Sequence, residues 1–205
     1  MNREQRTLLT LLALAAPKSA AGGSSHATAE GFVHQQGTLA EVKANTSIGN
    51  VFNVRYFLRE RLGVDYKGNP SNFLLNDLSI PIWYGVRGSG QLRLAGQHLI
   101  PTTGVDRLFL LGGMGSLWLD LKVLFADPEL LGEIHLVGGY THQGVRFELE
   151  HVLNGTQDRI TGATTRGHVG YKVTDELLVG IAGETRYVPQ KPIDIPLGVF
   201  VRIGP

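Results

Sequence analysis

Cysteine is absent from the 205-residue chain, and its absence excludes both disulfide bonds and thiolate metal sites. A large charge of either sign is also missing, because 19 basic side chains balance 18 acidic ones for a net charge of +1. Such a chain has no electrostatic basis for binding nucleic acid, and we expect no nucleic-acid partner. The apolar contacts of a core or of a membrane must therefore hold the protein together.

Charged residues are scarce at 18% of the chain, whereas glycine is abundant at 27 residues. This combination favours tight turns and close-packed strands over long surface helices. The length is in the range of one β-barrel or β-sandwich domain and leaves little room for a second domain.

The first segment is organised like a secretory signal peptide. Arg3 and Arg6 precede an apolar run over residues 7–16, which is too short to cross a bilayer as a helix, since that takes about 20 residues. Small residues precede Ala21 and Ala29, so we predict cleavage after Ala21, with Ala29 as the later alternative. An amphipathic N-terminal helix is the other interpretation of this segment.

No later apolar run approaches the length of a membrane-spanning helix, so any membrane-embedded part of the mature chain must consist of strands. The sequence predicts three regions: a signal peptide over 1–21, a flexible lead over 22–37 and a β-barrel domain over 38–205.

From Leu39 onward, apolar and polar residues alternate with a period of two, which is typical of strands with one face in each of two environments. The last third shows this most clearly, where Val169 and Tyr171 oppose His168 and Lys172. The segment 166–187 resembles a meander hairpin of small bacterial outer-membrane β-barrels, a likeness of architecture only. It implies an all-β chain forming a single antiparallel meander barrel of about 8–10 strands.

Some segments fit this pattern less well. Residues 51–62 have apolar side chains at helical spacing before a capping Gly63, and 117–125 are equally ambiguous. We expect a turn at 87–90 from its Arg-Gly-Ser-Gly sequence and a loop at 97–107.

Alternation alone leaves open whether the polar or the apolar face lines the interior of the barrel. The composition of the polar face favours the interior. That face mixes both charge signs with small residues, which suits a narrow lumen of paired ions. The predicted lumen charge network consists of Arg55, Arg93, Glu148, Glu150, Arg166, His168, Lys172, Glu184, Arg186 and Arg202. The apolar face carries five tyrosines expected at the membrane interface: Tyr56, Tyr84, Tyr140, Tyr171 and Tyr187.

The favoured interpretation is a small barrel in the bacterial outer membrane. Its expected partners are the lipid bilayer and, through its loops, another envelope protein. The alternative is a soluble, exported, lipocalin-like barrel in the periplasm or outside the cell, holding an apolar small molecule. Phe200 keeps this alternative open, because many outer-membrane barrels end in an aromatic residue, whereas the aromatic residue nearest this C-terminus lies on the polar face.

The sequence contains no recognised catalytic signature. Glu133 with His135, or Glu150 with His168, could form an acid–base pair and join Ser116 as a nucleophile only if the fold brings them together. No histidines stand at a metal-ligand spacing on a predicted helix. We therefore expect no metal, no cofactor and a structural, narrow-channel or partner-binding role rather than catalysis.

Overall fold

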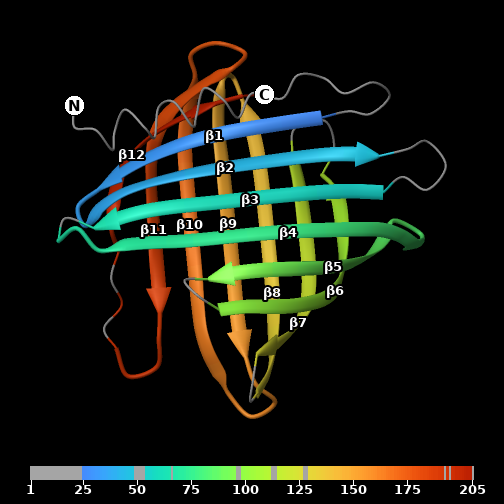
Figure 1. Cartoon of the computed structure of the whole chain (residues 1–205). Helices are drawn as coiled ribbons and strands as arrows, with labels where there is room; N and C mark the ends of the chain where they lie inside the picture. The colour runs from blue at the N-terminus through green and yellow to red at the C-terminus, as the bar shows by residue number, and fades with distance from the viewer. Residues whose placement is uncertain are drawn as a thin grey trace.

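The computed structural model describes residues 25–48, 54–65, 67–95, 98–111, 115–126, 129–191, 193 and 195–204, and the signal peptide predicted over 1–21 lies outside this range. Every regular element of the described residues is a β-strand (Figure 1). No helix among them is long and apolar enough to span a membrane. The strands are β1 (Ser25–His34), β2 (Gly37–Ile48), β3 (Val54–Asp65), β4 (Pro70–Trp83), β5 (Val86–Ala95), β6 (His98–Leu110), β7 (Gly115–Ala126), β8 (Glu129–His142), β9 (Val145–Gly155), β10 (Ile160–Lys172), β11 (Leu177–Tyr187) and β12 (Leu197–Ile203).

Each strand pairs with its neighbours in the chain, and β1 pairs with β12 to close the barrel. All pairs are antiparallel, and the closing register places Ala29 opposite Ile203. The prediction of an all-β antiparallel meander barrel is confirmed, with twelve strands rather than eight to ten. Figure 1 shows the strands of one wall crossing those of the other steeply, as expected from the strand tilt of a closed barrel.

The barrel begins earlier than predicted. The range 22–37, expected as a flexible lead, contains β1, which is paired along its length with β2 and along half of it with β12. This pairing satisfies backbone groups that a free lead would leave to water. The barrel therefore begins at Ser25 rather than at residue 38.

The ambiguous segments are strands as well. Val54, Leu58 and Leu62 of β3 are four residues apart, a spacing that fits one face of a helix but also one face of a strand, because four is a multiple of two. Pairing with β2 and β4 selects the strand. The segment 117–125 is part of β7, and most of the loop expected over 97–107 is part of β6.

The turn between β4 and β5 consists of Tyr84 and Gly85, three residues before the predicted turn at 87–90. Both residues have positive φ, at 34° and 79°, as do Gln143 and Gly144 between β8 and β9, at 47° and 80°. Two-residue hairpins with this geometry match the twist of the strands that they join, and glycine adopts it without strain.

Two rims bound the barrel. The terminal rim carries the start of β1, the end of β12 and the turns at 84–85, 143–144 and 173–176. The opposite rim carries the turns at 35–36 and 156–159.

The barrel has a polar interior and an apolar exterior. Along β7, Asp120 and Lys122 are 0% and 4% exposed, whereas the intervening Leu121 and the following Val123 are 42% and 41% exposed. The same inversion runs around the barrel, with Ile80, Leu92, Ile181 and Val199 among the exposed side chains. An apolar outer wall is stable in hydrocarbon, and the closed sheet leaves no unpaired edge there, so the barrel spans a membrane. The lipocalin-like alternative is wrong, because that fold needs an apolar interior.

We expect the protein to remain with the membrane fraction after gentle lysis and to require detergent for extraction, because its outer wall is apolar. On SDS gels the unheated sample is expected to migrate faster than the heated one, since the closed barrel resists SDS until heated. Release into the soluble fraction without detergent would contradict the membrane-spanning arrangement.

Candidate functional site in the lumen

The charged side chains of the interior form several ion-paired clusters, together called the lumen network, and the cluster with the most cations is centred on Glu41 of β2. This carboxylate is 3% exposed and contacts four cations. Its oxygens lie 2.7 Å from Lys43, 2.7 Å from Arg59, 2.9 Å from Arg61 and 3.3 Å from Arg166. A buried carboxylate needs such compensation, because an unpaired charge in this environment is strongly unfavourable.

Arg59 connects opposite walls of the barrel. Its guanidinium binds Glu150 of β9 through two nitrogens at 2.5 and 2.9 Å, in the fork geometry that arginine makes with a carboxylate. His135 lies 2.9 Å from the same carboxylate. Since β3 and β9 are six strands apart in the ring of twelve, this ion pair crosses the bore and narrows it.

Further ion pairs fill the interior beside the Arg59–Glu150 pair. Arg93 of β5 binds Glu133 of β8 at 2.6 and 2.5 Å, and Arg166 binds Glu184 of β11 at 2.7 Å. Each of these pairs combines two buried side chains. Each arginine therefore compensates a carboxylate on another strand.

Nearer the terminal rim, Glu30 of β1 accepts hydrogen bonds from Arg202 at 2.8 and 2.6 Å, and its other oxygen lies 3.0 Å from His168. Arg202 also binds Glu148 at 2.6 Å. The Phe200 ring, fully buried, packs edge-on to His168 at 5.0 Å between centroids. The buried Phe200 ring thus lies directly beside the ionic cluster of Glu30, His168 and Arg202.

The wall formed by β4–β7 holds three buried carboxylates. Asp77, Asp106 and Asp120 are at most 3% exposed there. Lys122 pairs with Asp120, and Arg55 lies 3.4 Å from Asp106. One oxygen each of Asp77 and Asp106 has no hydrogen-bond partner among the described residues. This wall therefore holds carboxylate oxygens that the described side chains leave without a donor.

The structure places eight of the ten predicted network residues in interior ion pairs: Arg55, Arg93, Glu148, Glu150, Arg166, His168, Glu184 and Arg202. The other two lie at the rims. Arg186 reaches Glu184 but its side chain is 67% exposed, and Lys172 binds Asp175 of the turn at 2.8 Å. That hydrogen bond lowers the pKa of Asp175.

Sequence reasoning missed the partners of these residues, which occupy the same alternating positions: Glu30, Glu41, Arg59, Arg61, Asp77, Asp106, Asp120, Lys122 and Glu133. The alternation itself could have identified most of them. Glu30 was missed because it lies in the range interpreted as a lead.

Four of the five predicted interface tyrosines lie toward the terminal rim. Tyr56 is near the start of β3, Tyr84 is in a turn, and Tyr140 and Tyr171 are near the ends of β8 and β10, whereas Tyr187 ends β11 at the opposite rim. Their assignment to a membrane interface remains a proposal, which the 70% exposure of Trp83 at the terminal rim supports.

The hypothetical acid–base pairs do not form as predicted. His135 contacts Glu150 rather than Glu133, and His168 contacts Glu30 rather than Glu150. Within the described part of the chain, no hydrogen bond joins Ser116 to either histidine.

Two cavities lie inside the barrel. The mouth cavity, of about 330 Å³, opens at the opposite rim, where Gln36, Asn69 and Arg186 line it. The mid-lumen cavity, of about 280 Å³, is lined by four arginines, one histidine and three glutamates: Arg59, Arg61, Arg93, Arg166, His135, Glu133, Glu150 and Glu184. Glu184 lines both cavities, so they adjoin at this side chain.

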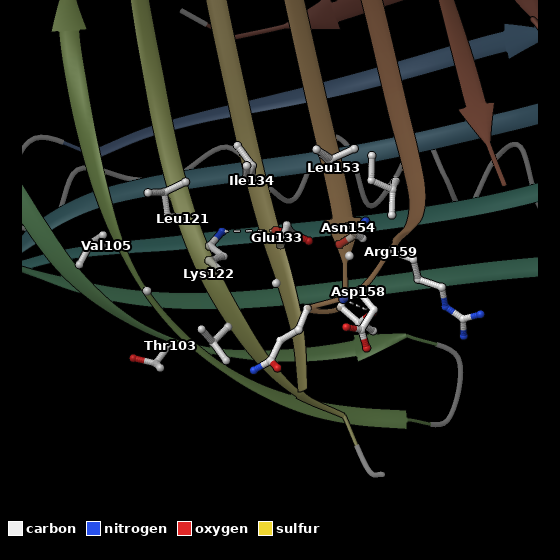
Figure 2. Close-up of a pocket in the computed structure, with 17 residues that line it drawn as sticks. Thr103, Val105, Leu121, Lys122, Glu133, Ile134, Leu153, Asn154, Asp158 and Arg159 are labelled. Atoms are coloured by element: carbon white, nitrogen blue, oxygen red, sulfur yellow. Dashed lines mark hydrogen bonds and ion pairs between the residues drawn. The ribbon is translucent and has the colours of Figure 1, made fainter. Parts of the chain in front are cut away.

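A larger hollow of about 930 Å³ lies on the outer wall rather than in the lumen (Figure 2). Aliphatic side chains of β6–β9, including Leu121, Ile134 and Leu153, line it beside the 156–159 turn with Asp158 and Arg159. Gly132 and Gly155, opposite each other in register, leave this part of the wall without side chains. The hollow faces lipid, and Lys122 and Glu133 of the ionic interior also contribute to its lining (Figure 2).

Solved structures with a similar fold are bacterial porins. The "NanC porin" superposes with a TM-score of 0.63 at 8% identity, covering 86% of this chain and 98% of the other. The "KdgM porin in complex with disordered oligogalacturonate" gives 0.57 at 11% identity, covering 88% and 98%. No protein-family model and no curated protein sequence matches the chain.

The fold is that of an outer-membrane porin. The apolar exterior, the ionic interior and this fold together locate the protein in the bacterial outer membrane, where closed antiparallel barrels of this kind occur.

Replacing Arg59 by alanine is expected to destabilise the barrel by about 3–5 kcal/mol, because Glu150 loses its bidentate partner and Glu41 loses one of four cations. Arg186→Ala, which removes an exposed arginine, is the matched control with an expected effect of about 0–1 kcal/mol. Urea unfolding of both variants in detergent or vesicles, followed by tryptophan fluorescence, measures the difference. Equal midpoints would show that the cross-lumen pair does not stabilise the fold.

Proposed function

We propose that the barrel is a narrow channel for small anionic solutes, entered through the mouth cavity and constricted by the lumen network. The observation that carries this proposal is the lining of the mid-lumen cavity. Its four arginines outnumber its three glutamates, and the excess of one positive charge remains when Glu41 and Lys43, which belong to the same cluster, are both counted and His135 is neutral. A carboxylate that enters can therefore bind an arginine without displacing every internal partner.

The route of entry supports a channel. Arg61 of the mid-lumen cavity lies 3.9 Å from Glu184, where the two cavities adjoin, and this distance is long for an ion pair. Arg61 also shares Glu41 with three other cations, so its loss would not leave that carboxylate unpaired. Arg61 is the side chain best placed to exchange Glu184 for a passing anion.

The comparison with porins agrees with this proposal. One structure of similar fold was determined with oligogalacturonate, whose sugar units each carry a carboxylate. Small sugar acids are accordingly the solute class that we propose to test first. The cross-lumen pairs also favour a second candidate, a structural barrel whose bore stays closed.

Purified protein reconstituted in planar bilayers is expected to give small, anion-selective currents in a potassium chloride gradient. Arg61→Gln should lower the ratio of chloride to potassium permeability, because it removes one positive charge from the mid-lumen cavity. Arg107→Gln is the matched control, since Arg107 lies on the exposed outer face of β6, against Phe109. Both variants are checked for folding by the gel shift on heating.

Absence of current from the folded wild-type barrel would favour the structural role over the channel. Current that is cation-selective, or a permeability ratio that Arg61→Gln and Arg107→Gln change equally, would contradict the proposed anion site.

A further inference from the structure

Among the described residues, the outer wall carries one carboxylate at a depth where hydrocarbon is expected. Glu60 lies near the middle of the twelve-residue strand β3, on the outward-facing side with Leu58 and Leu62, and its side chain is exposed. It makes no hydrogen bond or ion pair with any described residue. An ionisable group facing lipid at mid-depth is unfavourable and rare, and it indicates an interaction with a partner inside the membrane.

The neighbouring cations cannot supply that partner. Lys43, Arg59 and Arg61 all point into the lumen, where they bind Glu41. The described outward-facing positions of β2, β3 and β4 carry no lysine, arginine or histidine. Among the described residues, Glu60 therefore has no cationic partner on its own wall.

A complementary group faces outward from the opposite wall. His151 lies near the middle of the eleven-residue strand β9, between the outward-facing Leu149 and Leu153. Its Nδ1 is 2.8 Å from the hydroxyl of Thr165, its single polar contact among described residues. When that hydroxyl donates to Nδ1, the ring proton is on Nε2, which can then donate a hydrogen bond away from the barrel.

Glu60 and His151 lie at the same depth. The residues that precede them, Arg59 and Glu150, form the bidentate pair that crosses the bore. That pair ties β3 and β9 together at one level of the lumen, so the next residues point out of opposite walls at that level. Figure 1 shows β3 and β9 in opposing walls.

Small residues lie diagonally beside both groups and leave room for a second wall to approach. Val42 of β2 is directly opposite Glu60, and Ala40 and Ala44 are the next outward-facing residues on either side of Val42. Beside His151, Gly167 of β10 leaves open space where a side chain would stand. Close approach between small residues, with a polar contact across it, is typical of protein contacts within membranes.

We propose that copies of this chain associate side by side in the outer membrane, with Glu60 of one copy accepting a hydrogen bond from His151 of the next. All copies share one orientation in the membrane, and the two faces are on opposite walls. The contact is therefore heterologous and extends into rows rather than closing into a pair. This association does not depend on whether the lumen conducts.

The absence of cysteine makes the contact directly testable by disulfide formation. Full-length Glu60→Cys and His151→Cys variants are reconstituted in vesicles, separately and mixed, and then oxidised. The proposal expects a covalent dimer in the mixture and none in either variant alone, because the contact joins different faces. The gel shift on heating confirms that each variant is folded.

A charge exchange provides the second test. Native mass spectrometry of wild-type protein in mild detergent is expected to show oligomers, which Glu60→Leu or His151→Leu reduces to monomers. The double variant Glu60→His with His151→Glu is expected to restore the oligomers, since the pair is re-formed in the reverse sense. The control Leu62→Ala, two residues along β3, is expected to keep them.

Three results would overturn the proposal. Cross-linking of Glu60→Cys with itself would show a symmetric contact between identical faces. Cross-linking of neither variant nor of the mixture, with folded protein, would show that the faces do not meet. Capture of Glu60→Cys by a different envelope protein in cells, without a dimer, would assign the carboxylate to another partner.

Discussion

The structure depends on one constraint: a charge placed inside the narrow barrel needs compensation from its own strand, a neighbouring strand or the far wall. Glu41 meets this constraint with four cations from β2, β3 and β10. Arg59 meets it by reaching β9 on the far wall. The outer wall can then be largely aliphatic, because most charged side chains of the alternating strands are paired inside.

Alternation could be predicted because each strand separates two unlike environments. The 164–187 hairpin shows it directly, with His168 and Glu184 inside and Val169 and Ile181 outside. β1 was missed because its outward residues are Ala27, Ala29 and Gly31, whose weak hydropathy contrast resembles a loop. β6 was missed for a related reason, since its Pro-Thr-Thr-Gly sequence over 101–104 is typical of a turn. Pairing on both sides forms strands that local composition does not favour.

The candidate site was less predictable than the fold. Which side chains face the lumen follows from a period of two, and eight of ten were placed there. Their partners depend on closure, which sets β3 against β9 and β1 against β12 across most of the chain's length. The strands of each pair are far apart in the sequence. The ion pairs Arg59–Glu150 and Glu30–Arg202 could therefore not be predicted from the sequence. Closure of the barrel also forms the mid-lumen cavity, because its lining residues come from strands that are distant in the sequence.

The lumen network also specifies the register of the barrel. A slip of one residue between neighbouring strands would turn a whole row of charges toward lipid, which the apolar exterior forbids. A slip of two residues would keep each side chain on its face, so hydrophobicity alone does not prevent it. Such a slip in β3 would carry Arg59 past both Glu41 and Glu150 and leave buried carboxylates with fewer cations. Buried ion pairs contribute little net stability compared with apolar packing, but breaking one is costly. Pairing in the lumen therefore disfavours misregistered barrels that the alternation of apolar and polar residues alone would allow.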